Sequence, residues 1–239
     1  MEQQVLPPTP SPYRSAGWAA IASGTVGLIA FALLITAVTS RSSWILDSRV
    51  YLLFRAHDIG VVLQFLLMIP VALGLRRLSL TSRRPITAAT LATGIGAILF
   101  VVLLLLLGMG KIVSDMFYML PLGVFGVWLI VILWRLAETL PRWLRYFGIV
   151  VGLGLALVGT VFPGLVLFVY PEMIRIPAVP EAGTAHQDTL INTVIHVILN
   201  IGSLMGVITL PVWTALLGFR FLKRKYVAPP STANVLAKF

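Results

Sequence analysis

The chain has 239 residues, of which 59% are hydrophobic and only 11% are charged. Soluble domains carry about 25% charged residues, so this composition excludes an ordinary soluble domain. The formal net charge is +10 and there is no cysteine, which excludes disulfides, thiolate metal sites and thiol catalysis.

The excess of basic residues does not indicate nucleic-acid binding, because of where these residues stand. Most of them lie in short clusters between long apolar runs, which is typical of loops beside a membrane. The chain is therefore predicted to contact membrane lipid, with anionic headgroups at the basic loops, and to bind no nucleic acid.

The first 16 residues are polar and rich in proline, and they predict a disordered cytoplasmic arm. After them, six apolar runs reach about the 20 residues that a hydrocarbon core of about 30 Å requires. Runs of this length in lipid have to be helices, because a helix satisfies its own backbone amides. The predicted spans are residues 17–39, 56–75, 86–108, 117–134, 147–170 and 190–217, in a domain of residues 17–222 with a cytoplasmic tail at 223–239.

The distribution of Lys and Arg predicts the orientation of this all-α, polytopic bundle. Residues 1–16, 76–84, 135–145 and 218–239 hold 13 of the 18 basic residues, and only two of the eight acidic ones, Glu2 and Glu138. Because basic loops stay in the cytoplasm, both termini are predicted to be cytoplasmic. The first run exceeds the roughly 7–15 apolar residues of a signal-peptide core, so it is expected to be a retained span.

Small residues four apart favour close helix packing inside the bundle. The pairs are Ala20 with Gly24, Gly148 with Gly152, and Gly202 with Gly206. Tryptophans near span ends are expected to anchor helices at the membrane interface; they are Trp18, Trp134, Trp143 and Trp213. Prolines inside four spans are expected to kink them; they are Pro70, Pro121, Pro163 and Pro211.

The last span begins in the stretch DTLINTVIHVILN, which carries Asp188, Asn192, His196 and Asn200 at intervals of four. At 100° per residue, they form one broad polar face that descends from the outer surface. Exposing such groups to lipid would cost several kcal/mol, so the face is predicted to turn into the bundle. It would either hydrogen-bond to neighbouring helices or line a cavity open to the outside.

A second polar group opens the second span, in the stretch YLLFRAHDIG. Arg55 and Asp58 are three apart and can pair on one helix face, which would make the group an interfacial salt bridge. Alternatively, His57 and Asp58 form the rim of the same outer cavity, and Gln64 continues it two turns deeper. The predicted pocket lining is therefore Asp188, Asn192, His196 and Asn200, with His57, Asp58 and Gln64 opposite.

No cofactor or catalytic residue is predicted. A haem between His57 and His196 is geometrically conceivable, and imidazole with Asp58 or Asp188 could bind a metal such as zinc. Neither arrangement has the spacing of a known motif, and the chain contains no phosphate-binding loop, GxSxG or HExxH.

The stretch WLIVILWRLAETLPRWLRYFGIVVGLGLALVG joins the fourth and fifth spans, and PVWTALLGFRFLKRK ends the sixth. Both resemble a family of small bacterial six-helix integral membrane proteins of unknown function. The resemblance implies this architecture and a bacterial plasma (inner) membrane, and it brings no activity.

Together these features predict a multi-pass plasma-membrane protein without a soluble domain. The favoured function is non-enzymatic: a binder, sensor or transporter of a small polar solute, which would use a polar pocket in the outer half of the bundle. The alternative is an accessory or scaffolding subunit of a larger membrane complex, in which the polar face of the last span serves only helix packing.

Overall fold

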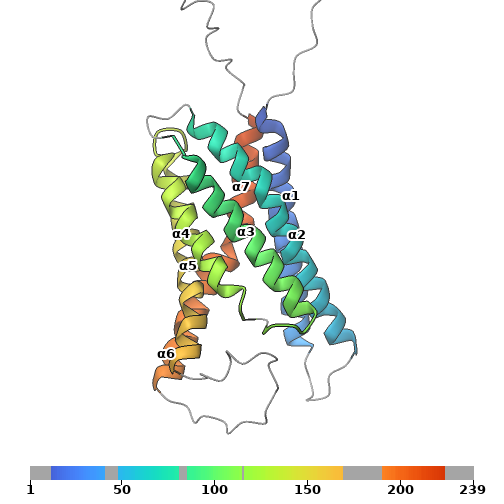
Figure 1. The fold of residues 1–239 in the computed structure, drawn as a ribbon. Helices are drawn as coiled ribbons and strands as arrows, with labels where there is room; N and C mark the ends of the chain where they lie inside the picture. Colours follow the sequence, from blue (N-terminus) through green and yellow to red (C-terminus); the bar gives the residue numbers. More distant parts are fainter. Residues whose placement is uncertain (1–11, 41–47, 81–84, 115, 169–189, 224–239) are drawn as a thin grey trace, which may run out of the picture.

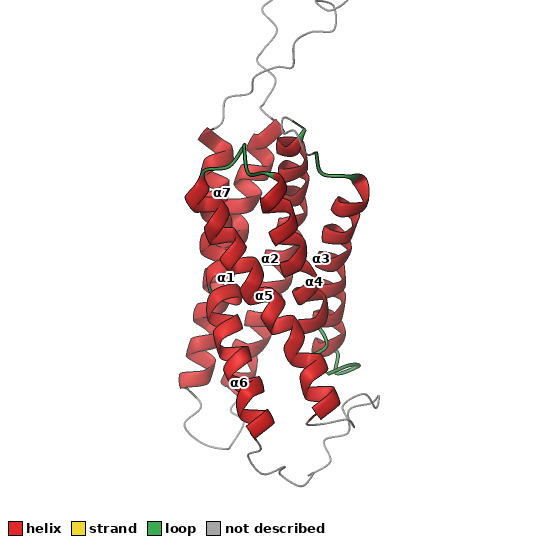
Figure 2. Cartoon of the chain, turned by 90° about the vertical axis from the view of Figure 1, so that its left-hand side faces the viewer, coloured by secondary structure: helices red, strands yellow, loops and turns green. Residues whose placement is uncertain are grey.

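The computed structural model describes residues 12–40, 48–80, 85–114, 116–168 and 190–223, and every regular element among them is a helix. The helices are α1 (Pro12–Thr39), α2 (Ser48–Ser79), α3 (Ala88–Met109), α4 (Met119–Arg135), α5 (Arg142–Phe168), α6 (Leu190–Gly202), the π-helical segment η2 (Ser203–Val207) and α7 (Thr209–Lys223). They run roughly along one axis as a bundle (Figure 1, Figure 2).

Five helical segments are long and apolar enough to cross a membrane. They are α1, α2, α3, α5 and the continuous run from Thr193 through η2 to Lys223. The sixth apolar helix, α4, has only 17 residues, which gives it a length of about 26 Å. It is therefore slightly shorter than a hydrocarbon core of about 30 Å.

The helices pack in a ring, each against its neighbours. In order, α1 contacts α2, α2 contacts α3, α3 contacts α4, and α4 contacts α5, while α7 closes the ring between α5 and α1. The beginning of α1 and the end of α7 lie at the same end of the bundle (Figure 1), where the Tyr13 and Phe221 rings stack with centroids 6.2 Å apart. Because Tyr13 is buried in this way, α1 begins at Pro12, inside the segment predicted to be a disordered arm.

Close contacts between glycines determine how tightly the helices approach. A Cβ atom on Gly123 of α4 would lie 2.6 Å from the Cα atom of Gly159 on α5, and a Cβ atom on Gly154 would lie 2.3 Å from the backbone nitrogen of Gly206. Any side chain there would push the helices apart. The glycines of the predicted pairs also lie close to neighbouring helices, since an added Cβ atom would come within about 3 Å of their atoms, and Ala20 is buried. All three pairs therefore lie inside the bundle: Ala20 with Gly24, Gly148 with Gly152, and Gly202 with Gly206.

Three of the four predicted interfacial tryptophans are exposed, as an interfacial position requires: Trp18 by 56%, Trp134 by 69% and Trp143 by 58%. The prediction is wrong for Trp213, which is completely buried. Its indole lies against α5 because Gly148 has no side chain there, and a Cβ atom on Gly148 would come within 2.5 Å of the indole nitrogen.

The sixth predicted span is not one regular α-helix. Between α6 and α7 the amide of Ile208 donates to the carbonyl of Ser203, 3.0 Å away and five residues earlier. Pro211 follows in the first turn of α7. It has no backbone N–H to donate to a carbonyl of the preceding turn, and the π-helical segment η2 accommodates this missing hydrogen bond. Pro121 likewise lies in the first turn of α4, where a helix tolerates proline without a kink. Pro70 and Pro163 lie inside α2 and α5.

Candidate functional site

Basic side chains gather at the end of the bundle where α1 begins and α7 ends, which we call the basic end. They are Arg14, Arg76, Arg77, Arg135, Arg142, Arg145, Arg220 and Lys223. The helix directions place Arg49, Arg55 and Lys111 at the opposite end. The candidate site lies in the half of the bundle that is farther from the basic end.

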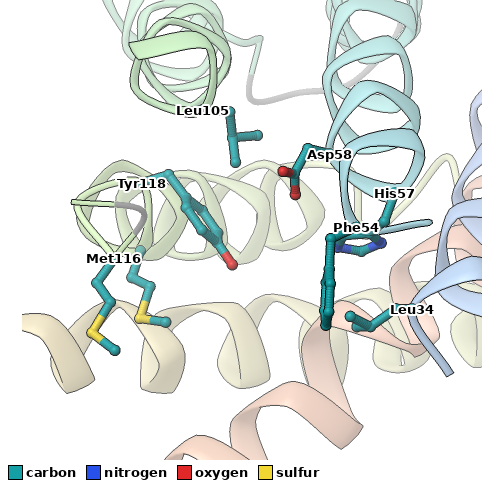
Figure 3. A pocket seen from close by; sticks show the side chains of 8 residues that line it. Leu34, Phe54, His57, Asp58, Leu105, Met116 and Tyr118 are labelled. Atoms are coloured by element: carbon teal, nitrogen blue, oxygen red, sulfur yellow. The ribbon is translucent and has the colours of Figure 1, made fainter. Parts of the chain in front are cut away.

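A cavity of about 330 Å³ opens in that half, between α2 and the beginning of α4. We call it the α2–α4 cavity (Figure 3). Its lining consists of Leu34, Phe54, His57, Asp58, Leu105, Met116, Tyr118 and Met119. Ligand sites have about this size and mix apolar walls with a few polar groups.

The imidazole of His57 is oriented by the neighbouring helix α1. Its Nδ1 atom lies 2.9 Å from the carbonyl oxygen of Ala30. A carbonyl can only accept, so Nδ1 carries the proton, and Nε2 of the neutral ring is an acceptor. Gly60, one turn further along α2, permits this contact, because a Cβ atom there would lie 2.8 Å from the Cβ atom of Ala30.

Asp58 and Tyr118 approach the cavity from different elements. The carboxylate of Asp58 on α2 and the hydroxyl of Tyr118, just before α4, both point into the space between these elements (Figure 3). Arg55, the predicted salt-bridge partner of Asp58, donates from Nε to the hydroxyl of Tyr51 over 2.8 Å. Its guanidinium lies over the Tyr51 ring, 5.1 Å from the centroid.

Gln64 does not line the α2–α4 cavity. It is only 5% exposed and lies where α1, α2 and α7 meet, because a Cβ atom on Gly27 would come within 2.6 Å of its amide and 2.7 Å of Pro211. The backbone carbonyl of Gln64 accepts a hydrogen bond from the Ser23 hydroxyl over 3.0 Å. The structure therefore places Gln64 in a helix interface.

One side of α6 packs on α5, and Ile195 is buried there beside Val161. On one flank of this contact, Val194 and Ile198 line an outer groove with the exposed Thr160 of α5. At 100° per residue, the next flank around the helix, opposite the groove, carries Thr193, His196 and Asn200. We call these three residues the polar flank of α6.

The polar flank lies on the side of α6 away from the groove with Thr160. It is exposed along its whole length. The physical reason is that α6 packs against α5, whereas α1 and α2 lie on the other side of the bundle (Figure 1). No side-chain hydrogen bond ties His196 or Asn200 to the rest of the described chain.

The structure thus brings together only part of the predicted pocket. His57 and Asp58 share the α2–α4 cavity, while Gln64 is buried elsewhere, and His196 and Asn200 stand on the exposed flank of α6. Asp188 lies outside the described residues, as does the side chain of Asn192 in α6. His196 is not part of the cavity lining, so the two histidines do not face each other across it.

Two larger hollows lie on outer faces of the bundle. One, of about 420 Å³, is the groove between α5 and α6, and the other, of about 570 Å³, runs over α3, α4 and α5. Threonine hydroxyls are the main polar groups in their lining, apart from the indole of Trp128, which donates to the carbonyl of Thr90 over 2.7 Å. Neither hollow contains a charged residue, which leaves the α2–α4 cavity as the stronger candidate among the described residues.

Sequence reasoning missed Tyr118 and the two methionines beside it, Met116 and Met119. Met116 and Tyr118 lie in the short connection before α4, and Met119 is the first residue of α4. They reach the cavity only because this part of the chain lies close to α2. Within the described residues, no three side chains of His, Asp or Glu come together as a metal site would require.

Comparison with known proteins adds no relative. No family model, no curated protein and no solved structure matches the chain. The likeness to small bacterial six-helix membrane proteins therefore remains a prediction from the motifs.

Proposed function

We propose that the chain is a six-span protein of a bacterial plasma membrane, with both termini in the cytoplasm, that binds, senses or transports a small polar solute. In this arrangement α4 also crosses the membrane and brings the number of spans to six. Its 17 residues are at the lower limit for helices that cross a bilayer. The gathering of eight basic residues at the end shared by α1 and α7 supports a cytoplasmic basic end.

The observation that carries the functional proposal is the α2–α4 cavity, where an imidazole, a carboxylate and a phenol lie within one hollow of about 330 Å³. Ionisable groups inside a membrane are costly and usually mark a pathway or binding site. The cavity lies in the half away from the basic end, so its ligand would arrive from outside the cell.

The polar flank of α6 would add polar groups in the same half of the bundle, outside the lining of the α2–α4 cavity. No described helix covers its residues, and amide and imidazole groups are costly to expose to lipid, which favours a water-filled entrance over contact with lipid. Asn192 and Asp188, which the sequence predicts for the same lining as His196, stay predictions.

Ligand-dependent stabilisation tests the proposal. The purified full chain would be heated in mild detergent with small amines, amino acids, sugars and organic acids in turn. A ligand that binds the folded state raises the melting temperature with concentration. We expect at least one class to do so, and expect His57→Ala and Tyr118→Phe to reduce the effect. If no class stabilises the wild type, the solute-binding proposal fails.

A second candidate function is that of a subunit in a larger membrane complex. It is favoured by one observation: His196 and Asn200 are exposed on a spanning helix, and a partner helix could satisfy them. Extraction in mild detergent separates the two functions. A stoichiometric hetero-complex that His196→Ala dissociates would favour the subunit, whereas a monomer that binds solute would favour the cavity.

A further inference from the structure

The polar groups of the α2–α4 cavity are mainly hydrogen-bond acceptors. Asp58 supplies a carboxylate, which accepts and does not donate when ionised. In the neutral imidazole of His57, the single N–H is at Nδ1 and donates to the carbonyl of Ala30, so Nε2 offers a lone pair. Tyr118 adds a hydroxyl that can accept as well as donate. A ligand that matches these groups has to bring the donors itself.

The charge of the lining agrees with this. It contains one acidic residue and no Lys or Arg. The nearest basic residue along the chain, Arg55, is bonded to Tyr51 and lies over that ring. A carboxylate has two oxygens and about four acceptor positions, so a contact within the protein leaves Asp58 with capacity for a ligand.

The remaining walls are aromatic, aliphatic and thioether groups. Phe54 and Tyr118 present rings, and the remaining apolar lining consists of Leu34, Leu105, Met116 and Met119. Aromatic faces attract cations, while the aliphatic side chains favour an apolar body. With a volume of about 330 Å³, the cavity is at the small end of ligand sites.

We propose that the cavity binds a small organic cation, a protonated amine on an apolar body, with its N–H donors toward Asp58 and His57 Nε2 and its body between Phe54 and Tyr118. This assignment rests on the proposed function, because it names the class of solute for that same site. An anionic solute would meet the Asp58 carboxylate without a basic partner in the lining, and a neutral polyol would leave the apolar walls unmatched.

Three probes test which charge the cavity prefers in its ligand. They share a phenylethyl body and differ in the polar group: 2-phenylethylamine, 2-phenylethanol and 3-phenylpropionate. Binding to the purified full chain would be measured by calorimetry and by the shift in melting temperature. We expect the amine to bind best and the carboxylate not to bind. We expect Asp58→Asn to weaken the amine about tenfold or more, since it removes a charge-assisted hydrogen bond, and to leave the alcohol nearly unchanged.

Glu138→Gln is the matched control, because Glu138 lies at the basic end of the bundle, far along the chain from the cavity. Amine binding that survives Asp58→Asn would overturn the assignment, and so would wild-type protein that prefers the alcohol or the acid. If Asp58→Asn does not fold, the three probes on the wild-type protein still test the assignment to an organic cation. Stabilisation by sugars or acids that depends on His57 would refute the amine and retain the solute-binding function, whereas no binding by any class would refute both.

Discussion

The indole nitrogen of Trp213 donates a hydrogen bond to the carbonyl oxygen of Leu144, 3.0 Å away. This contact joins the second turn of α7 to the first turn of α5, where both residues are completely buried. The indole occupies the space that Gly148 leaves by having no side chain. An aromatic ring and a hydrogen bond thus hold together two helices that are distant in the sequence, since the two residues are 69 positions apart.

Replacing Trp213 should therefore destabilise the bundle in two steps. Trp213→Phe removes the hydrogen bond and is expected to lower the free energy of unfolding by about 1 kcal/mol. Trp213→Ala also leaves a cavity and should cost about 3–5 kcal/mol. Thermal unfolding in detergent measures both effects. Trp143→Phe is the control, since Trp143 is 58% exposed, and an equal loss there would contradict the importance of the buried contact.

The contact between Gly123 and Gly159 makes a separate prediction about α4 and α5. Gly159→Leu places a side chain where a Cβ atom would already lie 2.4 Å from the Cα atom of Gly123. Overpacking of this kind costs about 1–3 kcal/mol or more, so the melting temperature should fall. Gly96→Leu on α3 is the matched control, because a Cβ atom on Gly96 would have no neighbour within 4 Å among the described residues. Comparable losses in the two variants would show that the close approach is not needed.

The absence of cysteine allows the orientation to be tested directly. Single cysteines would be introduced at Ile112, which is 56% exposed after α3, and at Ala137, which is exposed between α4 and α5. If the basic end is cytoplasmic, a membrane-impermeant maleimide should label Ile112→Cys in intact cells and Ala137→Cys only after lysis. The reverse pattern would place the basic end outside.

His196→Ala distinguishes a binding role of the polar flank from a packing role. His196 is exposed and makes no side-chain hydrogen bond within the described chain, so its removal should change the melting temperature little. If the flank lines the solute site, binding of the stabilising solute should weaken. A lower melting temperature with unchanged binding would instead show that the imidazole serves helix packing.

Much of the fold could be predicted from the sequence, because the length and hydropathy of a run are local properties. The helices α3 and α5 appear within a few residues of the predicted spans, and α1 extends one turn earlier because Tyr13 packs on Phe221. The second span is longer than predicted, since α2 continues back to Ser48 beyond its apolar part. The sequence predicted a kink at Pro211 but not the π-helical segment η2 before it, because that segment depends on how α6 and α7 pack on the glycines of α5.

Less of the candidate site than of the fold could be predicted from the sequence. Periodicity predicted a shared face for His196 and Asn200 and a shared lining for His57 and Asp58, but it could not relate one helix to another. Gln64 shows the difference: it follows His57 by two turns, yet it is buried against Gly27 and Pro211.

The sequence by itself determined that this chain is a bundle of apolar helices with most of its basic residues at one end. Each helix must satisfy its own backbone in lipid, and the charged residues lie between the apolar runs. Only the tertiary structure decided which polar groups meet. The rotation and separation of the helices depend on contacts between distant small residues, such as Gly123 with Gly159 and Gly60 with Ala30. Those contacts place His57 and Asp58 opposite Tyr118 and leave α6 with an uncovered polar flank.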